Sequence, residues 1–192
     1  MSRIVLASAS PRRFEILKQV GIKFEVIPSN ADERYDLKER PEIIAKKLSV
    51  KKAKSVAEKL KDDSLVIGAD TIVVSDVVLG KPENRDEAFK MLELQQGKWH
   101  EVITGICVIR AYDGKCIDDF EITRVKMRPL DKNSINAYIN AGESMDKAGA
   151  YGIQGVGALL IEKIEGCYYN VVGLPLVKLS YMLEEFGYNL LV

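Results

Sequence analysis

The stretch LVIGADTIVV at residues 65–74 decides the fold class of this chain. It is rich in valine and isoleucine, as buried β-strands are, and a polar turn follows it at residues 75–76. Asp70 stands in the middle of this predicted strand. An ionised carboxylate in a buried strand is costly unless it is paired or binds a metal ion. Asp70 is therefore a candidate metal ligand or general base, and the alternatives are a structural ion pair or a strand that ends before it.

Outward from this strand, the hydrophobic pattern predicts further strands and helices in mixed order. The predicted strands cover residues 3–7, 24–27, 65–74, 99–110, 120–127 and 158–164. One predicted helix begins at Pro11 and is closed by Gly21. The other predicted helices cover residues 41–60, 82–95, 131–141 and 175–186. Because strands 99–110 and 120–127 follow each other around a turn near Asp113 and Gly114, they form a predicted hairpin. The order of elements therefore predicts an α/β domain with a long mixed sheet.

Length and charge limit the classes of function. A chain of 192 residues with 47% hydrophobic residues is long enough for one globular domain, residues 1–192, with room for two lobes. Its 28 basic and 28 acidic residues give a formal net charge of zero. Proteins that bind duplex DNA or a membrane surface usually carry a basic excess, so we expect no nucleic-acid or membrane partner. A small polyanionic ligand needs only a local basic pocket.

The cysteines and the N-terminal segment bear on the cellular compartment. The three cysteines, Cys107, Cys116 and Cys167, form no C-x-x-C pair, so neither a zinc site nor a disulfide framework is predicted. Residues 1–10 are too short and polar for a signal peptide, and no apolar run reaches the roughly 20 residues that span a bilayer. The expected location is the cytoplasm.

Several familiar catalytic motifs are absent from the sequence. There is no G-x-x-x-x-G-K-[ST] segment, which excludes a P-loop, and no G-x-G-x-x-G segment follows a predicted strand. His100 is the single histidine, so the sequence holds no H-E-x-x-H zinc motif. We expect His100 to be a structural residue on its strand, and Trp99 and Tyr138 to belong to the core. Tyr151 is either a core residue or a ring that stacks on a base.

The segment SASPRR at residues 8–13 is a candidate phosphate site. It lies between a predicted strand and a helix that begins with a proline and that Ser10 can cap. Backbone N–H groups at a helix N-terminus favour an anion, and Ser8, Arg12 and Arg13 would add donors suited to phosphate. The alternative is a capped helix with solvated arginines.

Two lysines and a second carboxylate are weaker candidates. Lys52 lies on the apolar stripe of the predicted helix 41–60, so it either extends from the edge of the core or points into a polar pocket. Lys81 stands between a glycine and a proline before a helix and could point toward a ligand, although most such lysines are simply exposed. Glu33 lies in a polar loop, and its position alone indicates no function.

The glycine-rich segment at residues 146–155 is the last candidate. Its three glycines let the backbone pass close to a ligand or to a neighbouring strand. Gln154 can donate and accept hydrogen bonds at once, so it could read a base edge. For the glycines alone, a tight structural loop is the better interpretation.

Taken together, these segments resemble the Maf family of nucleotide pyrophosphatases, which are relatives of the inosine triphosphate pyrophosphatases. The resemblance covers nearly the whole chain, and its motifs occur in family order. They are LASASPRRFEIL (6–17), ADTIV (69–73), LGKP (79–82), GKWHEVITG (97–105), DKAGAYGIQG (146–155) and NVVGLP (170–175). The run at residues 147–154 resembles the branch that acts on dTTP and UTP, whereas Ser144 stands where the family pattern has proline.

The resemblance implies a fold and an activity. The fold is an elongated mixed β-sheet flanked by helices, with a central cleft between two lobes. The activity is hydrolysis of dTTP and UTP, with CTP or modified pyrimidine nucleotides as further candidates, to the monophosphate and pyrophosphate. It implies a divalent cation, Mg²⁺ or Mn²⁺, a homodimer and a house-cleaning role.

The resemblance also implies roles for individual residues. Asp70 looks like the proton acceptor that activates water, and Glu33 like a metal ligand or second carboxylate beside it. The expected triphosphate cradle consists of Ser8, Arg12, Arg13, Lys52 and Lys81. Arg13, Thr71 and Gln154 occupy positions that the family associates with substrate choice.

The main alternative is a nucleotide-binding regulator of cell division or septum formation with little catalysis. Such a protein needs a phosphate cradle but no buried carboxylate beside it. Asp70 is the discriminating residue, and it favours an enzyme.

Overall fold

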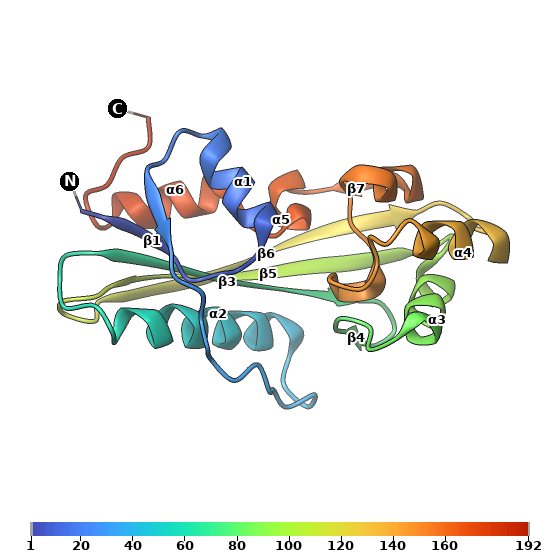
Figure 1. Ribbon diagram of the computed structural model, residues 1–192, viewed down its shortest axis with the longest axis horizontal. Coiled ribbons are helices and arrows are strands. Elements are labelled where there is room, and N and C mark those ends of the chain that lie inside the picture. The colour runs from blue at the N-terminus through green and yellow to red at the C-terminus, as the bar shows by residue number, and fades with distance from the viewer. Residues whose placement is uncertain (1, 192) are drawn as a thin grey trace. The chain divides into compact units, whose positions relative to one another are not determined.

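The computed structural model describes residues 2–191, which form a seven-stranded sheet and flanking helices (Figure 1). The strands are β1 (Ile4–Leu6), β2 (Phe24–Val26), β3 (Leu65–Val74), β4 (Val78–Leu79), β5 (Trp99–Arg110), β6 (Cys116–Met127) and β7 (Ile161–Glu165). The helices are α1 (Pro11–Gln19), α2 (Pro41–Ala57), α3 (Arg85–Gln95), α4 (Lys132–Asn140), α5 (Tyr168–Val172) and α6 (Leu176–Glu184). Short 3-10 turns are η1 (Ala148–Ala150) and η2 (Gly155–Leu160). No helix within this described part is long and apolar enough to cross a membrane.

The sheet is mixed, which confirms the predicted fold class. Its strand order is β2-β1-β3-β5-β6-β7, and β4 pairs with β3 outside this path. The β1 strand pairs in parallel with both β2 and β3, whereas β4 runs antiparallel to β3 and β7 antiparallel to β6. Neighbouring strands β5 and β6 are joined by a turn in which the Arg110 N–H donates to the Lys115 carbonyl at 2.9 Å. The predicted hairpin therefore forms.

The chain divides into two compact units. Of the described residues, unit 1 holds 2–70, 104–121 and 173–191, and unit 2 holds 71–103 and 122–172. In unit 1, α2 lies on one side of the strands, and α1 and α6 lie on the other (Figure 1). A core cluster joins the first strands to α2 through Val5, Ala7, Ala53, Val56, Val66 and Cys107.

Two glycines bring α2 close to the sheet of unit 1. A methyl group on Gly68 of β3 would collide with the backbone carbonyl of Ser49, and one on Gly105 of β5 would collide with that of Ala45. Only a residue without a Cβ allows a helix backbone to approach a strand this closely. This contact fixes the position of α2, and with it the direction in which Lys52 points.

Unit 2 has its own core, in which α3 and α4 contact each other. Ala88 and Leu92 of α3, Ile135 of α4, and Val125 and Met127 of β6 are all buried there. Asn84 and Asp131 cap the two helices, since their side chains accept from the backbone N–H groups of Glu87 and Ser134.

Some predicted element bounds were wrong. The β6 strand begins at Cys116 rather than at residue 120, and α3 begins at Arg85 rather than at residue 82, because Asn84 caps it. The predicted strand 158–164 is instead the turn η2 followed by β7, since Gly155 has a positive φ of 63° and directs the chain into a 3-10 turn. The short β4 and α5 elements were not predicted.

Candidate active site

Six of the nine predicted site residues belong to unit 1. They come from the end of β1, the start of α1, the loop before α2, α2 itself and β3: Ser8, Arg12, Arg13, Glu33, Lys52 and Asp70. The other three, Thr71, Lys81 and Gln154, belong to unit 2.

A lysine joins the two predicted carboxylates of unit 1. The Lys52 ammonium lies 2.5 Å from Oδ1 of Asp70 and 2.9 Å from Oε1 of Glu33. Asp70 is only 8% exposed, which confirms that a carboxylate is buried in this strand. Of the two options left open for Lys52, the structure selects a side chain that points into a polar cluster. The ion pair offsets the cost of burying Asp70.

Arg13 is buried and held in place by two hydrogen bonds. Its Nε donates to the carbonyl of Gly173 at 2.7 Å, and its Nη1 donates to Oγ of Ser8 at 3.1 Å. Only 8% of Arg13 is exposed, so the alternative of a solvated arginine is wrong at this position. Arg12, beside it in the first turn of α1, is half-buried.

Ser10 occupies the N-cap position of α1, but its side chain makes no capping hydrogen bond. The predicted side-chain cap is therefore wrong. The backbone N–H of Ser10 instead donates to Oγ of Ser8 at 3.2 Å, so the hydroxyl of Ser8 organises this turn. The Ser10 hydroxyl consequently does not compete with an anion for the first N–H groups of the helix.

The electrostatics of unit 1 tie Arg13 to the carboxylates. Burial lowers the pKa of Arg13, while the negative charges of Asp70 and Glu33 raise it and the neighbouring Arg12 lowers it further. A guanidinium stays charged in proteins. The cluster therefore holds three buried or half-buried cations, Arg12, Arg13 and Lys52, together with two carboxylates. Such a cluster can exchange its internal partners for the oxygens of a phosphate and for a cation.

The predicted site residues of unit 2 are half-buried or exposed. Thr71 follows Asp70 directly in β3 and is half-buried, whereas Lys81 and Gln154 are exposed. Gln154 immediately precedes η2. The exposure of Gln154 is compatible with contact to a ligand, and within the described residues of unit 2 no hydrogen bond fixes its amide.

Glu143 holds the segment that carries Gln154, and sequence reasoning missed it. Its carboxylate accepts from the backbone N–H groups of Val156 at 3.1 Å and Gly157 at 3.3 Å. A side chain on Gly155 would collide with this carboxylate. The one available signal was the glycine between Gln154 and Val156, which marks a close approach without naming the partner.

His100 and Tyr151 form the buried support of the same loop. His100 Nε2 and the Tyr151 hydroxyl lie 2.6 Å apart, and the Tyr138 hydroxyl accepts from the Gly152 N–H at 3.2 Å. Burial lowers the pKa of His100 to about 4, so the imidazole is neutral. These contacts confirm His100 as a structural residue and Tyr138 as a core residue, and they assign Tyr151 to the core.

Trp99 and Ser144 depart from expectation. Trp99 is only half-buried, and the guanidinium of Arg124 lies 4.7 Å from the centre of its ring, so the prediction of a core residue was wrong. Ser144, where the family pattern has proline, is fully buried, and its hydroxyl has no hydrogen-bond partner within residues 2–191. A proline would bury no hydroxyl there.

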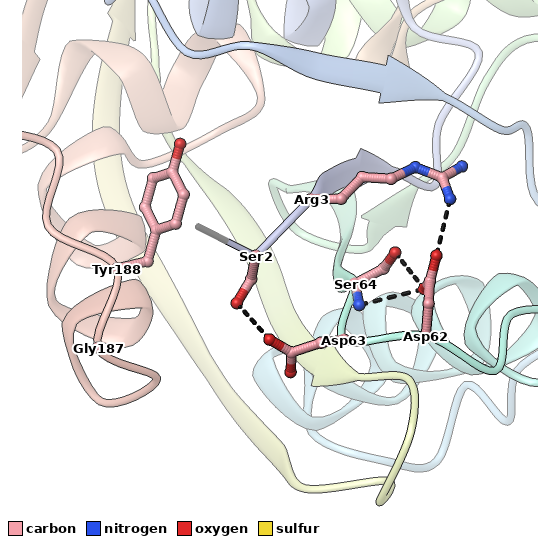
Figure 2. Close-up of a pocket in the computed structure, with 7 residues that line it drawn as sticks. All are labelled: Ser2, Arg3, Asp62, Asp63, Ser64, Gly187 and Tyr188. Carbon is pink, nitrogen blue, oxygen red and sulfur yellow. Dashed lines mark hydrogen bonds and ion pairs between the residues drawn. The ribbon is translucent and has the colours of Figure 1, made fainter.

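Unit 1 also holds a pocket of about 410 Å³ that is unrelated to the predicted site residues (Figure 2). Its charged side chains are already engaged with one another. Arg3 donates to Asp62 at 2.9 Å, and the Ser2 hydroxyl donates to Asp63 at 2.8 Å. None of the nine predicted residues lines this pocket, so it is not the candidate active site.

The fold and the cluster together define the class: a mixed α/β protein in which buried arginine and lysine lie beside two carboxylates, as suits a small anionic ligand. The profile of one family, described as Maf-like protein, matches residues 3–186. The chain belongs to this family, which confirms the resemblance seen in its motifs.

Curated relatives are similar over their full length. The chain is 50% identical to "dTTP/UTP pyrophosphatase" of Acetivibrio thermocellus, over 100% of this chain and 98% of the relative. It is 55% identical to the protein of the same name from Thermoanaerobacter sp. (strain X514), over 98% of this chain and 100% of the relative. Among solved structures, the Staphylococcus aureus Ham1 protein is a distant match, with 12% identity, a TM-score of 0.46 and coverage of 83% and 80% of the two chains.

Proposed function

We propose that this protein is a nucleoside triphosphate pyrophosphatase that hydrolyses dTTP and UTP to the nucleoside monophosphate and pyrophosphate. Relatives that carry this activity in their names share about half of its residues along the whole chain. The observation that carries the proposal is the buried Asp70, paired with Lys52 in a cluster that also holds Arg13. A binding regulator has no need for such a carboxylate.

The proposed triphosphate cradle starts from the donors of unit 1. Arg13 and Ser8 are already aligned by their mutual hydrogen bond, and Arg12 lies beside them. Guanidinium groups bind phosphate oxygens in a bidentate manner, and a side chain that is already ordered loses little entropy on binding. Lys52 is proposed to turn one of its three N–H donors toward the same phosphates.

Thr71, Lys81 and Gln154 keep the roles that the family resemblance implies. Lys81 is proposed to bind phosphate, and Thr71 and Gln154, together with Arg13, to select the base. The amide of Gln154 can donate and accept, which matches the adjacent donor and acceptor groups of a uracil or thymine edge.

Asp70 is the proposed general base. A water molecule transfers a proton to the Asp70 carboxylate while its oxygen attacks the α-phosphorus. The bond from this phosphorus to the α–β bridging oxygen breaks, and pyrophosphate leaves with its charge balanced by arginine and lysine. Positioning and electrostatic stabilisation supply most of the rate enhancement in reactions of this kind. Base catalysis contributes a further factor on the order of 10²–10⁴.

The donor set of unit 1 fits a divalent cation, Mg²⁺ or Mn²⁺. Carboxylate oxygens of Glu33 and Asp70 converge on one positive charge, the ammonium of Lys52, and hard cations prefer such oxygen ligands. Within residues 2–191 no three His, Cys, Asp or Glu side chains are grouped for a metal, so Glu33 and Asp70 would hold the ion together with substrate oxygens. When bound, the ion would neutralise charge on the phosphates.

A homodimer and a cytoplasmic location complete the proposal, with removal of unwanted nucleotides as its purpose. Sedimentation velocity of the purified chain tests for the homodimer. A single species with the mass of one chain, 21.4 kDa, across the accessible concentration range would exclude the dimer.

The test of the activity is a product analysis. The purified protein is incubated with Mg²⁺, or with Mn²⁺, and with dTTP, UTP, CTP, ATP or GTP, and products are separated by ion exchange. We expect monophosphate and pyrophosphate from dTTP and UTP, with much slower turnover of the purine nucleotides. Orthophosphate and diphosphate as products would contradict attack at the α-phosphorus, and no turnover with either metal would favour the regulator.

A further inference from the structure

Two of the three cysteines, which no motif connects, lie in contact in unit 1. Cys107 is on β5 and Cys116 on β6, neighbouring strands joined by one turn, and their Sγ atoms are 3.4 Å apart. Both are free thiols, and they differ in access, since Cys107 is buried and Cys116 is exposed. A solvent-accessible thiol with a second thiol behind it is the arrangement found in reversible redox sites.

The surroundings also distinguish the two sulfurs. The hydrogen bond between the thiols lowers the pKa of Cys116 and, together with burial, raises that of Cys107. The carboxylate of Asp118 disfavours the thiolate at both sulfurs and the ammonium of Lys46, on α2, favours it, and these two groups are paired at 2.7 Å. Cys116 is therefore the thiol that loses its proton first, and the thiolate is the reactive species.

We propose that Cys116 and Cys107 form a redox-active pair, in which Cys116 reacts with a peroxide and Cys107 then closes an intramolecular disulfide. The contact at 3.4 Å and the exposure of Cys116 carry this proposal. A disulfide requires the sulfurs to approach from this distance to about 2.05 Å.

Both steps balance with hydrogen peroxide as the oxidant. The Cys116 thiolate attacks one peroxide oxygen, the O–O bond breaks, and hydroxide leaves, which gives a sulfenic acid. The Cys107 sulfur then attacks Sγ of Cys116, the S–O bond breaks, and the hydroxide departs with the proton of Cys107 as water. Two thiols and one peroxide become one disulfide and two waters, and a dithiol reductant reverses the change.

Cys167 supplies an internal control. It belongs to unit 2 and is half-buried, and within residues 2–191 it contacts no second thiol. Simple exposure to oxidant would modify it without forming a disulfide. The proposed site therefore predicts loss of Cys107 and Cys116 together while Cys167 stays reduced.

The experiment treats the full-length protein with one equivalent of hydrogen peroxide, quenches with catalase and counts thiols in denaturant. We expect the count to fall from three to one, and dithiothreitol to restore it. A non-reducing tryptic digest should link the peptide of residues 99–110 to that of residues 116–124, because Arg110 and Lys115 are cleaved between them. A count that stays at three, or a disulfide that includes Cys167, would overturn the proposal.

Variants separate the two steps. After peroxide treatment, the thiol count of the Cys167→Ser protein should fall from two to none. The Cys116→Ser protein should keep both of its thiols. Cys107→Ala and Cys107→Ser, each checked for folding by circular dichroism, should accumulate a sulfenic acid on Cys116 that dimedone traps. Absence of that adduct in both folded variants would exclude Cys116 as the attacking thiol. These readouts do not depend on nucleotide turnover.

Discussion

At the scale of single residues, Asp70 carries the largest expected effect. Asp70→Asn keeps the size of the side chain and an oxygen that can accept from Lys52, so we expect the fold to persist. Turnover of dTTP should fall at least about 10²-fold, because the amide cannot take a proton from water. Steady-state kinetics measure the loss, and circular dichroism verifies the fold. Near-normal turnover in a folded Asp70→Asn protein would assign the base to another group.

His100 should make the stability of the protein depend on pH. Burial lowers its pKa from 6.5 to about 4, so the unfolded chain binds a proton in this window and the folded chain does not. The contribution of His100 is therefore complete above pH 6.5, is lost as the pH falls toward 4, and amounts to about 3 kcal/mol.

Urea unfolding at several pH values measures this effect. His100→Phe removes the titrating group, so the decline in free energy of unfolding between pH 6.5 and 4.5 should be smaller than in the parent protein. The carboxylates titrate in both proteins and cancel in the difference. Equal declines would mean that His100 is protonated in the folded state.

Local sequence singled out charged residues of the cluster in unit 1 better than it identified their partners. Asp70 and Lys52 stood out because a charge interrupts an apolar pattern, and the structure pairs them. The carbonyl of Gly173, which accepts from Arg13, lies 160 residues away along the chain, so no local pattern could reveal it. Ser10 fits a cap by type, yet its hydroxyl does not cap, since capping depends on a rotamer that the sequence does not specify. The roles of the site residues stay predictions.

At the scale of elements, the contact of α2 with the sheet is the most sensitive feature. Gly68→Ala and Gly105→Ala each place a methyl group against the α2 backbone, which is not free to move as a flexible side chain is. We expect each to lower the free energy of unfolding by about 1–3 kcal/mol. Lys54→Ala, on the exposed face of α2, is the control and should change it little. Full stability of Gly105→Ala would show that α2 can move away from β5.

The loop that carries Gln154 depends on Glu143. Glu143→Ala removes the acceptor of two backbone N–H groups, so hydrogen exchange at Val156 and Gly157 should accelerate. If Gln154 selects the base, KM for dTTP should rise more than kcat falls, and preference for dTTP over ATP should narrow. Glu162→Ala, exposed on β7, is the matched control. Unchanged exchange at both amides would show that Glu143 does not hold the loop.

Composition and periodicity located the long elements correctly, since β3 and β5 have the predicted bounds and α4 lies within the predicted helix 131–141. They failed where the chain turns through glycines. The apolar residues 158–160 were assigned to a strand but belong to the 3-10 turn η2, whose conformation follows from the positive φ of Gly155 and the contacts of Glu143. The two-residue β4 is too short to show an alternating pattern at all.

At the scale of the whole molecule, family and fold class could both be predicted. The motifs at residues 6–17, 69–73 and 146–155 are specific in combination, and the family profile that spans residues 3–186 confirms them. The mixed order of strands and helices predicted the mixed sheet. Two lobes were expected, but the bounds of the two compact units could not be read from the sequence, because β3, β5 and β6 each contribute residues to both units.

The lysine between the two carboxylates makes the folded chain carry its own counter-ion. The buried Asp70 and the exposed Glu33 are both paired with Lys52, and Arg13 lies in the same field, so burying Asp70 does not require an added cation. Protein purified in a strong chelator should therefore keep its melting temperature, while Lys52→Met should become chelator-sensitive. Differential scanning calorimetry with and without EDTA measures both. Storage without metal should therefore leave the fold intact, and the cation proposed for turnover need arrive only with the substrate.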